Sequence, residues 1–273
     1  MTTRRAVLAQ AASFGGAATA LSAGANAATT SDRTRRGSHI RNFVLVHGAW
    51  HGGWCYRRVA DLLRAQGHHV ETPTLSGLGE RSHLAGFPIN CSTHIKDVVN
   101  VIRWERLDNV ILCGHSYGGL VIGGVADAIP EAISALVYLD CPLPENGKSA
   151  FDLVPQMQAS ALASTADYGG FLVKPPAAKA FGVNAADQAM VDALLTPHPL
   201  ASLCEPLRLT GAYMKIARKI YVEATNGHYP APARIREDQD WKVTEVPSGH
   251  DIMIDAPAAL TEILLGTVSP KAS

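Results

Sequence analysis

Short apolar runs alternate with segments of helical spacing along most of this chain. Continuous apolar runs of about four to eight residues are typical of strands buried on both faces, and Phe43–Val46 is the first of them. Later segments repeat the pattern, some of them less purely apolar. We therefore predict strands at residues 43–46, 69–72, 110–113, 135–139, 219–224 and 241–246.

The predicted helices lie between these strands. Apolar side chains recur at helical spacing in residues 54–66, 93–104, 117–128 and 256–265, and Ser92 is a candidate N-cap for the second of these segments. Strands that alternate with helices usually form a parallel sheet covered on both faces and joined by right-handed crossovers. The pattern predicts an α/β fold with a mostly parallel sheet of about six strands.

Residues 141–217 interrupt this alternation. The stretch is rich in proline and alanine, and helical spacing appears in it only as fragments. It is too long to be a plain connection within a domain. We predict a helical lid inserted after the strand that ends at Asp140, so that the core comprises residues 42–140 and 218–268.

The first 27 residues have the features of an export signal. Arg4 and Arg5 precede a mildly apolar run rich in alanine and glycine, and residues 25–27 offer a small-x-small cleavage site. These features predict a twin-arginine-type signal peptide and a periplasmic or secreted protein with no stable membrane insertion after cleavage. The alternative is an N-terminal membrane anchor. Residues 28–41 are polar and basic, and we expect a flexible lead-in there.

Composition narrows the possible functions. Lys and Arg together number 24, as do Asp and Glu, so the net charge is zero, and no basic stripe appears in the body of the chain. Nucleic acid is therefore not an expected partner. The five cysteines are odd in number and match no metal motif, so we expect mostly buried thiols, with one disulfide as the alternative. The chain has no HxH or HExxH pair, and we expect no metal site.

Ser116 is the candidate nucleophile. The pentapeptide Gly114–Gly118 (GHSYG) lies where an apolar run ends and a helical pattern of small residues begins. This context is that of a nucleophile elbow, a strained strand-to-helix turn that exposes a serine hydroxyl. Glycine is needed on each side of the serine because a Cβ there would collide with the adjoining strand or helix.

His250 is the strongest candidate for the base that a serine nucleophile needs. It follows the last predicted strand, so it lies at the same carboxyl edge of the sheet as Ser116. Two backbone amides are also required to hold an oxyanion. We predict the amide of Tyr117, directly after the nucleophile, and that of Ala49, in the turn after the first strand. For the turn at His47–Gly48 the alternative is a plain tight turn.

Three segments together resemble the α/β-hydrolase superfamily: VHGAWHGGW at residues 46–54, GHSYGG at 114–119 and SGH at 248–250. They are most similar to the branch of plant methylesterases, hydroxynitrile lyases and their bacterial relatives, which include esterases and carbamate or amide hydrolases. The resemblance covers residues 43–265 and implies that fold. Hydroxynitrile lyases of the branch carry a threonine and a lysine where this chain has Gly48 and Asp251. Without that lysine nothing holds a departing cyanide, so the departures disfavour lyase activity.

The acid of the expected triad is not at the position that the family commonly uses. That segment, residues 224–228, contains no carboxylate. Asp140, at the end of the preceding strand, is the favoured substitute because its carboxylate falls at the catalytic edge of the sheet. Glu223 is the alternative, since its longer side chain could reach His250 from the later strand. Either acid would orient His250 and stabilise its imidazolium.

We therefore expect a serine hydrolase that cleaves small-to-medium apolar esters, and also carbamates or amides, without a metal or organic cofactor. Trp50 and Tyr117, beside the nucleophile, are expected to contact the substrate. Hydroxynitrile-lyase-type cleavage and ligand binding on an inactive scaffold are the alternatives. Apolar side chains of the lid are expected to line the pocket, namely Phe151, Leu153, Met157, Leu162, Phe171, Leu203 and Tyr213.

Overall fold

A six-stranded sheet forms the centre of the structure, in which every strand pair is parallel. The computed structural model describes residues 40–86 and 88–267. In the order β2-β1-β3-β4-β7-β8, the strands are His69–Glu71, Asn42–Val46, Val110–His115, Ile133–Leu139, Lys219–Asn226 and Trp241–Gly249. All six predicted strands are present, and the predicted parallel sheet is confirmed.

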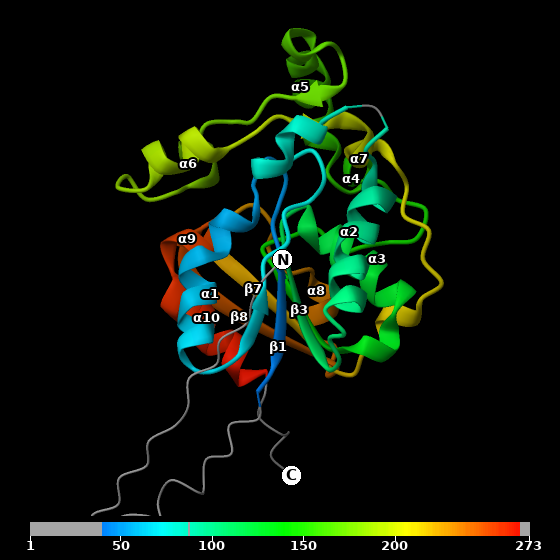
Figure 1. Ribbon diagram of the computed structural model, residues 1–273, viewed down its shortest axis with the longest axis vertical. Helices are drawn as coiled ribbons and strands as arrows, with labels where there is room; N and C mark the ends of the chain where they lie inside the picture. The colour runs from blue at the N-terminus through cyan, green and yellow to red at the C-terminus, as the bar shows by residue number, and fades with distance from the viewer. Residues whose placement is uncertain (1–39, 87, 268–273) are drawn as a thin grey trace, which may run out of the picture. The chain divides into compact units, whose positions relative to one another are not determined.

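Helices cover both faces of this sheet (Figure 1). One face carries α1, α9 and α10, and the other carries α2 and α3. Their bounds are Arg57–Ala65, Ile252–Asp255, Pro257–Gly266, Cys91–Trp104 and Gly118–Ala128. Shorter helices accompany them, namely η1 (Gly53–Tyr56), η2 (Gly79–Leu84), η3 (Pro130–Ala132) and α8 (Ala233–Arg236).

The predicted cap of α2 was wrong by two residues. Asn90, not Ser92, is the N-cap: its side chain accepts from the Thr93 amide at 2.9 Å, and the Thr93 side chain bonds back to Asn90. This reciprocal capping box satisfies amides that the first turn leaves free. Ser92 lies inside the first turn and donates to Glu205 instead.

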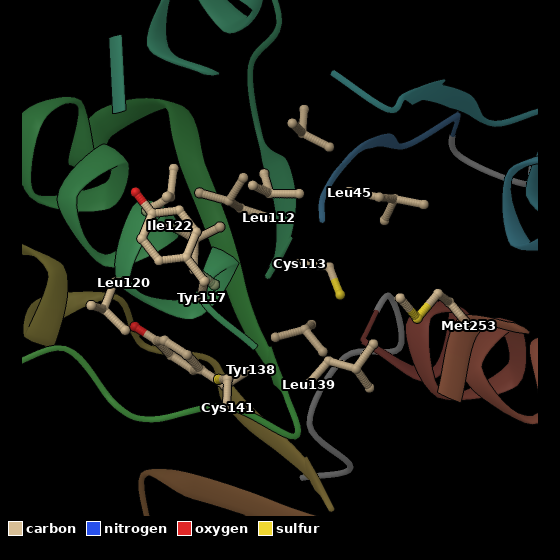
Figure 2. Close-up of a cluster of buried hydrophobic side chains, with 14 of the residues drawn as sticks. Leu45, Leu112, Cys113, Tyr117, Leu120, Ile122, Tyr138, Leu139, Cys141 and Met253 are labelled. Carbon is tan, nitrogen blue, oxygen red and sulfur yellow. The ribbon is translucent and has the colours of Figure 1, made fainter. Parts of the chain in front are cut away.

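The core lies between the sheet and its helices, on both faces. Alternate residues of a strand point to opposite faces, and Figure 2 shows Leu112 on the side of α3 and Cys113 on the side of Met253 of α9. All residues of β3 are buried. A strand covered on both faces needs apolar side chains throughout, which explains the continuous apolar run in the sequence.

The segment between β4 and β7, residues 141–217, is more irregular than the helical lid that we predicted. It contains several short helices and a two-stranded antiparallel sheet that the sequence pattern did not indicate. Its elements are α4 (Ala150–Leu153), α5 (Pro155–Ser164), η4 (Thr165–Tyr168), β5 (Leu172–Val173), η5 (Ala178–Phe181), α6 (Gln188–Leu194), β6 (His198–Pro199), α7 (Leu200–Cys204) and η6 (Ala212–Lys215). We call it the inserted segment.

Four strands deliver candidate residues to one edge of the sheet. Because all strands run the same way, their carboxyl ends lie together, the usual place for a site in an open α/β sheet. Ser116 follows β3, Asp140 follows β4 and His250 follows β8, while the loop after β1 carries Ala49.

The predicted signal peptide and most of the lead-in lie outside the described residues, so export stays a prediction. No helix within residues 40–86 and 88–267 is long and apolar enough to cross a membrane. All five cysteines are free, and four of them are buried, as expected for apolar packing.

Candidate active site

Ser116 lies at the tight turn between β3 and α3. Its φ of 52° is in the left-handed region, and its amide donates to the Leu139 carbonyl at 3.1 Å. A Cβ atom on Gly118 would lie 2.6 Å from the His47 carbonyl oxygen, so a residue with a side chain does not fit at this position. This local geometry is that of a nucleophile elbow, in which backbone strain presents a serine hydroxyl.

His250 and Asp140 form a buried pair beside this turn. Nδ1 of His250 lies 2.5 Å from Oδ2 of Asp140, and the two side chains are 3% and 0% exposed. A carboxylate only accepts hydrogen bonds, so Nδ1 of His250 carries the proton and its Nε2 keeps a lone pair. That lone pair enables His250 to take a proton from a hydroxyl.

Backbone amides of the loop after β7 hold the Asp140 carboxylate. The His228 amide donates to Oδ2 at 2.9 Å and the Tyr229 amide donates to Oδ1 at 3.1 Å. A Cβ atom on the preceding residue, Gly227, would collide with the carboxylate. The loop after β7 is where the family commonly carries the acid. Here that loop instead donates backbone amides to Asp140, which follows the neighbouring strand β4.

Glu223, the alternative acid, has other partners. Its Oε2 accepts from the Ala231 amide at 2.9 Å and forms an ion pair with Arg236. In the part of the chain that the structure describes, Asp140 is the one carboxylate that hydrogen-bonds to His250. The structure brings Asp140, and not Glu223, to the histidine.

The two predicted oxyanion donors, Ala49 and Tyr117, both line the cavity that contains Ser116. Neither of their amide hydrogens has an acceptor among the described residues. Nδ1 of His47 lies 2.8 Å from the Gly48 carbonyl oxygen, and its Nε2 accepts from the Leu75 amide at 3.0 Å.

These contacts of His47 fix the direction of the Ala49 amide. Since Nε2 accepts, the proton of the neutral ring is on Nδ1 and is donated to the Gly48 carbonyl. Burial lowers the pKa of His47 to about 3, which keeps the ring neutral. The Gly48 carbonyl and the Ala49 N–H belong to one planar trans peptide and point in opposite directions, so holding one orients the other.

Trp50 is held in place by the inserted segment. Its φ of 65° is unusual for a residue with a side chain and needs external support. Its amide donates to His198 Nδ1 at 3.3 Å, its carbonyl accepts from Thr196 at 2.9 Å, and its indole donates to the Val173 carbonyl at 3.1 Å. The Tyr117 hydroxyl is anchored separately, 2.9 Å from His94 Nδ1.

A cavity of about 500 Å³ opens beside these residues. Ser116, His250, Ala49, Trp50 and Tyr117 all line it. Asp140 is fully buried and is not among the residues that line the cavity. Of the seven apolar side chains that we expected from residues 141–217, only Met157 and Leu203 line the wall. Other apolar residues of that segment also line it, among them Ala150, Val154, Ala161, Val173 and Phe181.

The serine hydroxyl makes no hydrogen bond to any described residue. Serine–histidine contacts are often long in enzymes without substrate and shorten when substrate binds. The shared cavity is therefore the observation that joins Ser116 to His250, and the hydrogen bond of His250 adds Asp140.

Known proteins resemble the chain over nearly all of its described length. Residues 43–263 match the model of the alpha/beta hydrolase family. The chain belongs to the α/β hydrolase family. A carbendazim hydrolyzing esterase from Nocardioides sp. is 44% identical over 82% of this chain and 98% of that protein. This α/β hydrolase is thus a hydrolase enzyme of the esterase type.

More distant relatives of this α/β hydrolase agree with the assignment. Methylesterase 1 of Arabidopsis thaliana is 35% identical over 112 residues, which are 40% of this chain and 42% of that protein. An extracellular α/β-hydrolase from a Paenibacillus species has the same fold, with a TM-score of 0.72 and 24% identity over 83% of this chain and 98% of that one. That protein is described as sharing structural and functional homology with tobacco salicylic acid binding protein 2.

This α/β hydrolase differs from the hydroxynitrile lyases at Gly48 and Asp251, and both differences have a structural reason. A Cβ atom on Gly48 would lie 2.9 Å from His115 Nδ1 and 2.9 Å from Ser116 Cβ, which leaves no room for threonine. Asp251 is fully buried, does not line the cavity and pairs with His51 at 3.0 Å. The position that holds cyanide in a lyase therefore faces protein here.

One group of side chains near the site has ligand atoms of the kind that bind metals. Those of His115, His250 and Asp251 lie within 4.8 Å of one another. His250 is also bonded to Asp140, and Asp251 to His51, so both side chains have protein partners. We assign no ion to this group, and a metal-independent reaction stays a prediction.

Proposed function

We propose that this protein is a serine hydrolase that cleaves small-to-medium apolar carboxylic esters, with carbamates and amides as further substrates. The single observation that carries the proposal is the buried His250–Asp140 hydrogen bond of 2.5 Å, beside a cavity that Ser116 also lines. A relative named for carbendazim hydrolysis supports a compact, aromatic or apolar substrate.

In the first half of the proposed reaction, Ser116 is acylated. His250 Nε2 takes the proton from the hydroxyl as Oγ attacks the acyl carbon, and the carbonyl electron pair moves to the oxygen. The Ala49 and Tyr117 amides stabilise this oxyanion. Asp140 stabilises the imidazolium of His250 without taking its proton. The bond to the leaving alcohol or amine then breaks, and His250 returns the proton to it.

In the second half, water releases the acyl group. His250 Nε2 takes a proton from the water as its oxygen attacks the acyl carbon, and the same two amides hold the second oxyanion. The bond to Ser116 Oγ then breaks, and His250 protonates that oxygen. The products are a carboxylic or carbamic acid and the regenerated serine, so the cycle needs no metal and no organic cofactor.

The cavity wall supports apolar substrates. Most of its side chains are aliphatic or aromatic, and Trp50 and Tyr117 lie next to the nucleophile. Among the described residues that line the cavity, Lys174 is the one lysine, and there is no arginine, aspartate or glutamate. Such a wall favours neutral acyl groups of modest size.

Two other functions are disfavoured by specific observations. A hydroxynitrile lyase would need a cation beside the leaving cyanide, and Asp251 is an acid that points away from the cavity. A ligand-binding protein on an inactive scaffold would have no reason to keep a histidine and a carboxylate paired beside two free amides.

A panel of substrates tests the proposal. Purified protein is assayed with p-nitrophenyl acetate, butyrate and octanoate, a methyl carbamate such as carbendazim, an anilide and mandelonitrile. We expect turnover of the short esters, lost in Ser116→Ala and His250→Ala, and no cyanide release. Cyanide release from mandelonitrile without ester hydrolysis would establish the lyase instead, and activity that persists in Ser116→Ala would exclude Ser116 as the nucleophile.

A further inference from the structure

The ring of His51 connects two loops that carry the proposed chemistry. His51 lies in the loop after β1, two residues beyond Ala49, and Asp251 directly follows His250. Nε2 of His51 lies 3.0 Å from Oδ2 of Asp251, and the side chains are 1% and 0% exposed. The pair joins residues that are 200 positions apart in the sequence.

Both ring nitrogens of His51 have acceptors as partners. Nδ1 lies 2.8 Å from the Ala49 carbonyl oxygen, and Nε2 faces the Asp251 carboxylate. Neither oxygen has a hydrogen to donate, so both nitrogens must carry protons and His51 is an imidazolium. Although burial opposes the charge, the Asp251 carboxylate raises the pKa of His51 above its usual value. Burial likewise opposes charge on Asp251, yet His51 lowers its pKa to about 2.

His115 ties a third segment to the same place. It precedes Ser116, and its Nε2 lies 3.0 Å from the His250 carbonyl oxygen and 3.7 Å from Asp251 Oδ1. Burial lowers the pKa of His115 well below its usual value, so the ring is neutral. Within the described residues, Asp251 Oδ1 has no hydrogen-bond partner. The Asp251 charge is therefore balanced mainly by His51.

We propose that His51 and Asp251 are a positioning pair that holds the Ala49 loop against the His250 loop, so that the oxyanion donor and the base keep one relative geometry. The inference rests on the proposed serine hydrolase function. His51 restrains the peptide that follows the Ala49 amide, while Asp251 is bonded in sequence to His250. A displacement of either loop by about 1 Å would misplace a group that acts in the transition state.

The identity of residue 251 fits this role. An acid here pairs with His51, whereas a lysine at the same place would put a second cation against the imidazolium. Removing one member of a buried ion pair leaves the other charge without a partner, which is more disruptive than removing both. The effects of the two substitutions should therefore not add.

Kinetics of Asp251→Asn, His51→Gln and the double variant test the pair. We expect each single variant to lower kcat for a short ester at least about tenfold with KM within about twofold, because the loss falls on the transition state. Affinity for a trifluoromethyl ketone, which mimics the tetrahedral intermediate, should fall by the same factor. The double variant should be no worse than the poorer single one.

Asp255→Asn is the matched control. It removes a carboxylate from α9, the short helix that directly follows Asp251, where the Asp255 carboxylate accepts from Asn184 at 2.7 Å and makes no contact with His51 among the described residues. We expect its kcat to equal that of the wild type. Folded Asp251→Asn and His51→Gln proteins with wild-type kcat and wild-type affinity for the ketone would overturn the inference.

A measurement on the wild type covers the case in which the variants do not fold. In a nitrogen-15 NMR spectrum of histidine-labelled protein at pH 7.5, both ring nitrogens of His51 should be protonated. An unprotonated ring nitrogen on His51 would refute the ion pair. Failure of the proposed function would look different: the wild type would then hydrolyse no ester and would not react with a fluorophosphonate.

Discussion

The carboxylate of Asp140 fills the space that a side chain at Gly227 would need. The loop after β7 passes directly over the acid and donates two backbone amides to it, from His228 and Tyr229. An acid at the end of β4 therefore leaves no room for a side chain at residue 227.

Replacing Gly227 by alanine tests this relationship. The added methyl group should displace the Asp140 carboxylate from His250 and lower kcat by about tenfold or more, since the histidine loses its orienting partner. Ester hydrolysis at saturating substrate measures the effect. Gly266→Ala is the control, because a Cβ there meets nothing within 4 Å. Equal activity of the Gly227→Ala enzyme and the wild type would contradict the close packing.

The identity of the acid is tested by separate amide substitutions. Asp140→Asn should reduce kcat by about 10³- to 10⁴-fold, because the amide cannot fix the catalytic tautomer of His250. Glu223→Gln should change kcat only a few-fold, since Glu223 bonds to Arg236 and the Ala231 amide. Steady-state kinetics of both variants decide the matter. A greater loss in Glu223→Gln than in Asp140→Asn would reverse the assignment.

The buried histidines predict that the protein loses stability in acid. Burial lowers the pKa of His47 to about 3 and of His94 to about 4, and it lowers the pKa of His115 and of His198 well below the usual value. Below pH 6.5 the unfolded chain therefore binds more protons than the folded one, and stability falls as the pH falls. Each such histidine costs up to about 1.4 kcal/mol per pH unit, a limit reached where the unfolded histidine is fully protonated.

Thermal unfolding at pH 5, 6 and 7 measures this effect. Tm should rise with pH over the interval. His51 opposes the trend only near the upper end of the interval, because its pKa is raised: its contribution is complete below pH 6.5 and is lost as the pH rises above that value. The four histidines with a lowered pKa outnumber it, so Tm still rises between pH 5 and 7. A Tm that stays constant or falls between pH 5 and 7 would show that these histidines are not held neutral.

The cavity wall formed by α5 should set the size of the acyl group. Ala161 is buried and lines the cavity, so Ala161→Phe should raise KM for an octanoate ester by about tenfold while acetate hydrolysis changes little. Ala163→Phe, on an exposed position of the same helix, is the control. Comparable kinetics of Ala161→Phe for both esters would place the acyl group elsewhere.

The periodic parts of the sequence predicted the fold well, for physical reasons. Buried strands of a parallel sheet must be apolar throughout, and the helices between them need one apolar face, so both leave a readable pattern. The strand-end position of Asp140 was also readable, because carboxyl ends of parallel strands meet at one edge. The inserted segment left no such pattern: its elements are short, and β5 and β6 contain only two residues each.

Contacts between distant residues could not be read from the pattern. Nothing in the sequence pairs His51 with Asp251, or Gly227 with Asp140, because each pair forms only when separate loops meet at the sheet edge. The N-cap of α2, which we predicted at Ser92 and which the structure places at Asn90, shows the same limit on a local scale. Asn90 and Ser92 both suit an N-cap, and the direction in which the chain enters the helix decides between them.

The central claim, that Ser116 is a nucleophile activated by His250 and Asp140, is tested most directly by covalent labelling. Intact protein is treated with a fluorophosphonate and analysed by mass spectrometry before and after proteolysis. The account predicts one adduct, on the peptide containing Ser116, absent in Ser116→Ala and formed much more slowly in His250→Ala and Asp140→Asn. An unlabelled wild type, or an adduct on another residue that persists in Ser116→Ala, would contradict it.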